Sequence, residues 1–262
     1  MRRLLIQLLV TVLIFGGLFF GLKQINYLKH ANVDRLTKKS SEQLGKIMVE
    51  TFLLNKQEIK DPKLITIVDS IKNTLSDAAG IPADSIQLHI VRDTEINAFA
   101  LPGNHIVVLS GLINYSKNSD ELAGVLAHEI GHLSLGHIEK KLIKEVGLTM
   151  LFTMAGGNGG QEVIKEVVKT ISSSAFDRTY EEEADLFAVQ TMNKAGFDPE
   201  SLSAFMLRMS QQESVPELMV WMSSHPESKA RAATILEEAK KIKINKRVVI
   251  ATPWIEIQKL TN

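Results

Sequence analysis

The chain has 262 residues, enough for one sizeable hydrophobic core. Its 30 basic and 30 acidic residues cancel, which argues against a nucleic-acid partner. Cysteine is absent, which excludes disulfides, thiol catalysis and a zinc site with sulfur ligands.

The first predicted element is a membrane anchor. Residues 4–22 form an uncharged, mostly apolar run of about the 20 residues that a helix needs to cross a bilayer. Arg2 and Arg3 precede it as in a secretory signal, but the run is longer than the core of a cleavable signal and no clear small-residue cleavage site follows. We therefore expect an uncleaved single span rather than a removed signal. A buried helix of a soluble protein is a poor alternative, because such helices rarely lack a polar face.

The charges around this run bear on its orientation. Lys23, Lys29 and Arg35 make the segment after it at least as positive as the segment before it, which argues against a cytoplasmic N-terminus. A signal-like start followed by a large domain also favours export. We expect a single-pass membrane protein whose large domain lies on the extracytoplasmic, periplasmic side.

Two helices are predicted next. Residues 23–40 read as a charged connector, and apolar residues at helical spacing predict an amphipathic helix from Ser41. A second helix is expected to begin at Asp61-Pro62, because proline suits the first helical turn, and to end at Gly80.

A small sheet is predicted between these helices and the rest. Residues 86–91 alternate apolar and polar side chains, as a half-buried strand does. Residues 97–101 and 106–109 flank a Pro-Gly-Asn turn and read as a hairpin. After Asn118 the pattern is helical until a short strand expected at residues 248–250.

The predicted fold class is α+β, with a mostly helical body and a small antiparallel sheet. The expected parts are an anchor (1–22), a connector with an amphipathic helix (23–60), a main domain (61–240) and a C-terminal tail with a possible strand (241–262).

The clearest motif lies at the start of the helical part. Residues 128–132 read His-Glu-Ile-Gly-His, and on a helix His128 and His132 lie roughly 40° apart in projection, so both imidazoles can bind one ion. Zinc suits nitrogen ligands with one position left for water. Glu129 is then beside the metal, where it can take a proton from that water as the water attacks a peptide carbonyl. This mechanism is the one for which H-E-x-x-H is the signature.

His137 follows in what looks like a continued series. If the helix ran on, His137 would lie about 140° from His132 and face away from the metal. Its spacing also differs from the longer metzincin motif. We therefore reject His137 as a ligand.

The third ligand is expected in the segment Arg178-Thr-Tyr-Glu-Glu-Glu-Ala-Asp185. Glu181 and Asp185 are one helical turn apart and face the same way. Glu181 can coordinate zinc while Asp185 accepts a hydrogen bond from the free ring nitrogen of a ligand histidine. Spacing alone does not choose Glu181 over Glu182 or Glu183, and three consecutive glutamates are usually a solvated surface.

At this point the chain resembles the HtpX-like zinc peptidases, a family that includes the CAAX prenyl protease, the mitochondrial Oma-type proteases and periplasmic members such as LoiP and BepA. The resemblance extends over residues 60–235. With one predicted span, the chain is more similar to the Oma-type and periplasmic members than to HtpX itself. One departure is that Asn104-His105 replaces a second glycine after the turn. The segments that carry the resemblance are Asn97 to Gly103, His128 to His132, Arg178 to Asp185, Ala195 to Pro199, and His225-Pro226 with Arg231.

The resemblance implies a zincin-like fold and a gluzincin-type endopeptidase with one zinc ion per chain, held by His128, His132 and Glu181. It also implies substrates that are unfolded or misfolded envelope proteins. His225 is expected to donate to the oxyanion or to cap the zinc in a resting state; an ordinary loop histidine is the alternative. Arg178 is expected to order its acidic neighbours.

A different class of function is also compatible with these residues: a membrane-tethered, chaperone-like or binding protein with a latent or structural zinc site. Because all the ligand positions and the glutamate beside them are present, the sequence favours the enzyme.

Overall fold

A computed structural model describes residues 33–147, 160–211, 221, 223–226, 228–242 and 247–261. By compactness the chain divides into two units, Met1–Ser40 and Ser41–Asn262. Apart from the start of the first described helix, the features below belong to the second. The anchor expected at residues 4–22 lies outside the described residues. Within them, no helix is both long and apolar enough to cross a membrane.

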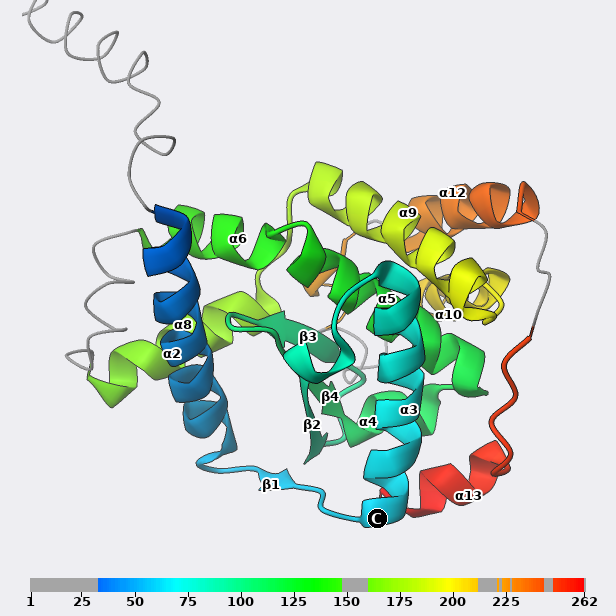
Figure 1. Ribbon diagram of the computed structural model, residues 1–262, viewed down its shortest axis with the longest axis horizontal. Helices are drawn as coiled ribbons and strands as arrows, with labels where there is room; N and C mark the ends of the chain where they lie inside the picture. The colour runs from blue at the N-terminus through cyan, green and yellow to red at the C-terminus, as the bar shows by residue number, and fades with distance from the viewer. Residues whose placement is uncertain are drawn as a thin grey trace, which may run out of the picture. The chain divides into compact units, whose positions relative to one another are not determined.

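Helices make up most of the described chain, as the sequence predicts (Figure 1). The longer ones are α2 (Val33–Leu53), α3 (Pro62–Ala79), α5 (Ser119–Ser134), α6 (His137–Val146), α8 (Gln161–Ser173), α9 (Arg178–Ala195), α10 (Glu200–Ser210) and α12 (Ser228–Lys240). Shorter ones are η1 (Ala83–Ser85), α4 (Ser110–Tyr115) and α13 (Trp254–Lys259).

Capping residues set the predicted ends of α3 and the predicted start of α5, whereas α2 begins at Val33 rather than at the expected Ser41. The Asp61 carboxylate accepts from the Leu64 N–H at 2.9 Å, and Gly80 ends α3 in the left-handed region at φ 72°. The Asn118 side chain accepts from the Glu121 N–H at 2.9 Å and so begins α5. These three boundaries confirm the predictions.

The sheet has four strands in the order β1-β2-β4-β3. β3 and β4 form the predicted hairpin, with Ala100 opposite Ile106. The expectation of an antiparallel sheet was wrong for β2, which runs parallel to β4 with Leu88 opposite Ile106. After β2 the chain passes to the far side of β4, forms β3 and returns, so β2 and β4 share a direction. The strands are β1 (Gln57–Glu58), β2 (Gln87–Arg92), β3 (Ala98–Leu101) and β4 (His105–Leu109).

The strand expected at residues 248–250 is not formed. Residues 247–250 have no regular secondary structure. The Val248 N–H donates to the Gly196 carbonyl at 2.9 Å, which ties the tail to the end of α9 rather than to a strand. The chain then continues into α13.

Helix α5 lies in the core and is buried from Glu121 to His132. It packs against α3, α9, α10 and strand β3. Gly131 permits the close approach of α9, since a Cβ there would lie only 3.3 Å from the Cα of Ala184. This close packing brings the predicted site residues of α5 and α9 to one place.

Candidate active site

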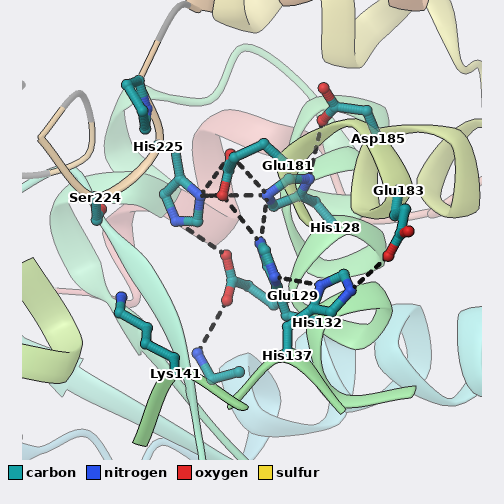
Figure 2. Close-up of polar contacts among 12 residues, drawn as sticks. His128, Glu129, His132, His137, Lys141, Glu181, Glu183, Asp185, Ser224 and His225 are labelled. Atoms are coloured by element: carbon teal, nitrogen blue, oxygen red, sulfur yellow. Dashed lines mark hydrogen bonds and ion pairs between the residues drawn. The ribbon is translucent and has the colours of Figure 1, made fainter. Parts of the chain in front are cut away.

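Four buried side chains from three parts of the chain converge (Figure 2). His128 and His132 come from α5, Glu181 comes from the first turn of α9, and His225 lies just before α12. One ligand atom from each of the four lies within 4.8 Å of the other three. The close-up shows their polar ends pointing toward one another.

The distances match what one small ion requires. The Nε2 atoms of His128 and His132 are 3.0 Å apart. A Glu181 oxygen lies 3.3 Å from Nε2 of His132, and Nδ1 of His225 lies 3.2 Å from Nε2 of His128. Imidazole nitrogens and one carboxylate are the ligands that zinc takes in four-coordinate sites. The residues present therefore fit a zinc ion.

The charge of the cluster also favours a cation. Burial alone would raise the pKa of Glu181, but the neighbouring His225 and His132 hold it well below its usual range. The carboxylates of Glu181 and Asp185 share the guanidinium of Arg231, which donates to Asp185 through two nitrogens at 2.7 Å each. One negative charge is thus left over in a buried place, which a bound cation compensates.

His128 is oriented by Asp185. Its Nδ1 lies 3.0 Å from a carboxylate oxygen of Asp185, which leaves Nε2 pointing into the cluster. Burial opposes protonation of His128, but Asp185 and Glu181 raise its pKa. A carboxylate behind a ligand histidine is the usual way to fix the ring and its tautomer.

Glu129 lies beside the cluster rather than in it. One of its oxygens accepts from the Ala100 N–H of β3 at 2.9 Å, and the other lies 3.5 Å from Nε2 of His225. Burial raises the pKa of Glu129 to about 7. A carboxyl group with such a pKa can both accept and release a proton near neutrality.

Two further predicted residues have different surroundings. His225 is buried, and this burial lowers its pKa to about 4, which keeps the ring neutral and able to donate an electron pair to a metal. Arg178 is exposed at the start of α9 and lines a surface cavity with Glu182 and Arg231. It therefore lies on the outer side of Asp185.

The sequence did not reveal the surroundings of His132. His137 was rejected as a ligand, and it is not in the ligand group, but it does not face away: its Nδ1 lies 3.0 Å from Nδ1 of His132. α5 ends at Ser134, and Gly136 turns the chain in the left-handed region at φ 66°. The ring of Phe176 stacks on His132 with centroids 4.0 Å apart.

Two histidines and a glutamate around one ion, with a second glutamate next to the first histidine, define the class of zinc metallopeptidases. The chain belongs to peptidase family M48, whose model matches residues 60–239. This confirms the resemblance found in the motifs.

Characterised relatives carry related activities in their names. The beta-barrel assembly-enhancing protease of Yersinia pestis is 27% identical over 216 residues, 76% of this chain and 44% of that protein. The mitochondrial metalloendopeptidase OMA1 of Bos taurus is 28% identical over 249 residues, 83% of this chain and 47% of that protein. OMA1 of Schizosaccharomyces pombe is 31% identical over 154 residues, 58% of this chain and 46% of that protein. The chain thus spans a little under half the length of these relatives.

Proposed function

We propose that this chain is a membrane-anchored zinc endopeptidase that hydrolyses peptide bonds of unfolded or misfolded envelope or membrane proteins. The observation that carries the proposal is the convergence of four buried donor atoms within 4.8 Å, with the Glu129 carboxyl group alongside. The names of the bacterial and mitochondrial relatives support a substrate in or near a membrane.

In this proposal His128, His132 and Glu181 hold the ion, and Asp185 with Arg231 orients His128. When bound, zinc acts as a Lewis acid that makes a water molecule more acidic and polarises a carbonyl oxygen. Arg178 stays outside this group and orders the acidic start of α9.

Glu129 is the proposed general base. The Ala100 N–H holds one carboxylate oxygen, so the other is aimed toward the ligand cluster. It takes the proton of the attacking water and passes it to the amine that leaves. Burial that raises the pKa of Glu129 to about 7 suits both transfers.

Two proposed roles are alternatives for His225: a cap on the ion in a resting state, or a hydrogen-bond donor to the oxyanion. In the described arrangement its Nδ1 is one of the four donors, so His225 would occupy the fourth coordination position of the ion. Cleavage requires that position, so a capping His225 must withdraw. In the alternative role His225 does not bind the ion and instead donates a hydrogen bond to the oxyanion.

Strand β3 is the proposed guide for the substrate. It lies at the edge of the sheet, beside α5 and next to Glu129. An extended peptide can add to such an edge through main-chain hydrogen bonds, which give affinity with little dependence on sequence. This mode suits unfolded substrates.

The test is cleavage of casein and zinc content of the full chain in detergent. Glu129→Gln removes the base without touching a ligand, so we expect one zinc per chain and no turnover. Glu181→Ala removes a ligand, so we expect both zinc and turnover to be lost.

The outcomes separate the competing functions. If the native chain and Glu129→Gln both bind one zinc and neither cleaves casein, a binding or chaperone-like role is favoured. A peptidase with a narrow substrate remains favoured only if proteins trapped in cells by Glu129→Gln are cleaved by the native chain. If Glu181→Ala keeps its zinc, the ligand assignment is wrong.

A further inference from the structure

His132 differs from His128 in the support behind its ring. A carboxylate lies directly behind Nδ1 of His128, but behind Nδ1 of His132 lies another imidazole, that of His137, at 3.0 Å. The other nitrogen of His137, Nε2, lies 3.0 Å from a carboxylate oxygen of Glu183. The three side chains form a continuous line from the ligand cluster outward (Figure 2).

His137 is held firmly in this line. Its side chain is completely buried, and its ring stacks on Tyr180 with centroids 4.4 Å apart and planes 15° apart. Both of its nitrogens are occupied by the contacts to His132 and Glu183. Glu183 ends the line at the surface, with 49% of its side chain exposed.

The geometry leaves one consistent placement of protons. Nε2 of His132 must be unprotonated to bind a metal, so the proton of that ring is on Nδ1 and donates to His137. Nδ1 of His137 then accepts, and its own proton is on Nε2, where it donates to the Glu183 carboxylate. Each step follows from the one before it.

We propose that His137 and Glu183 are positioning residues that fix the tautomer and ring orientation of the ligand His132. They do for His132, in two steps, what Asp185 does for His128 in one. The inference rests on the proposed role of His132 as a ligand. It also gives the three consecutive glutamates separate positions: Glu181 in the cluster, Glu183 behind His137, and Glu182 lining the surface cavity.

The test is the zinc affinity of the full chain, measured by competition with a chelator of known affinity. His137→Leu removes the acceptor for His132, so we expect affinity to fall by about 10–100-fold, the usual effect of losing such a partner. His137→Asn restores an oxygen near the place of Nδ1, so we expect affinity close to native. Glu183→Leu should weaken binding and Glu183→Gln much less, while Glu182→Leu, its neighbour outside the line, is the matched control.

A second readout is the tautomer itself. In zinc-free chain labelled with ¹⁵N-histidine, we expect His132 to carry its proton on Nδ1, and His137→Leu to shift it toward Nε2. A purely packing role for His137 would leave this equilibrium unchanged.

Several outcomes would overturn the inference. One is native zinc affinity in a folded His137→Leu chain; another is an equal loss in His137→Leu and His137→Asn. If His137→Leu does not fold, the Glu183 pair decides, and equal affinities for Glu183→Leu and Glu182→Leu would rule the relay out. If the native chain itself takes up no zinc, the proposed function fails as well. If the native chain binds zinc and the variants give one of the results above, only this inference fails.

Discussion

His225 occupies a position that an open peptidase site would leave free. Its Nδ1 lies 3.0 and 3.1 Å from the two oxygens of Glu181 and 3.2 Å from Nε2 of His128. A side chain so close to the other donors competes with water and substrate for the ion. These distances support the proposal that His225 caps the site in a resting state.

The variant His225→Ala tests this interpretation. Because alanine leaves the fourth coordination position open, we expect casein cleavage to rise several-fold and zinc to bind more weakly. The control is the double variant with Glu129→Gln, which must be inactive if the gain comes from the same site. A fall of about 10²–10³-fold would instead assign His225 to the oxyanion.

A separate pair of contacting histidines lies in the sheet, away from the ligand cluster. Nε2 of His89 in β2 lies 3.0 Å from Nδ1 of His105 in β4, and Nδ1 of His89 lies 2.9 Å from Glu58 in β1. Burial, with the nearby charges of His89 and Lys46, lowers the pKa of His105 to about 4. Its Nε2 has no hydrogen-bond partner among the described residues, so protonation would bury an unpaired N–H.

This predicts a loss of stability in acid. An unfolded chain binds a proton to His105 near pH 6.5, whereas the folded chain does so only near pH 4. Stability from the neutral ring is therefore complete above about pH 6.5 and falls as the pH drops toward 4, by up to about 3 kcal/mol. His105→Asn removes the titration, so its free energy of unfolding should fall less between pH 7 and 4.5 than that of the native chain. Parallel profiles of the free energy of unfolding against pH for the two proteins would contradict this prediction. The pKa of His225 is also lowered, but its titration is the same in both proteins and cancels in the comparison.

At the scale of elements, the sequence predicted what depends on neighbours along the chain. Asp61, Gly80 and Asn118 act within one turn of their own helices, so these boundaries follow from local chemistry. The hairpin of β3 and β4 needs only a turn and two flanking strands. The parallel pairing of β2 with β4 has no local signal, because it depends on which side of β4 the chain passes.

The orientation of His137 was predicted wrongly because helical periodicity was extended past the end of α5. The prediction that it faces away from His132 assumed an uninterrupted helix, but α5 ends before it and the chain turns at Gly136. Glycine after the last apolar turn is a recognised end signal, so the break could have been read from the sequence. The position of His137 beside His132 could not have been read from the sequence, because it depends on how α6 packs.

At the scale of the whole molecule, the site depends on contacts between distant segments. His128 and Glu181 are more than 50 positions apart, and only the packing of α5 on α9 brings them together. Spacing left Glu181, Glu182 and Glu183 as equals, and resemblance to a family chose among them. The structure separates them by position.

Attachment to a membrane is the other property of the whole molecule, and it rests on residues 4–22. We expect the full chain, produced in a bacterium, to remain in the membrane pellet after alkaline extraction and to begin at Met1. An arginine at the centre of a spanning helix costs about 2.5–3.5 kcal/mol, so Leu9→Arg with Leu13→Arg should release the chain, while alanine at both positions should not. Protease added outside spheroplasts should digest the large domain. Extraction of the native chain would refute the anchor, and a mature form lacking about 22 residues would show a cleaved signal instead.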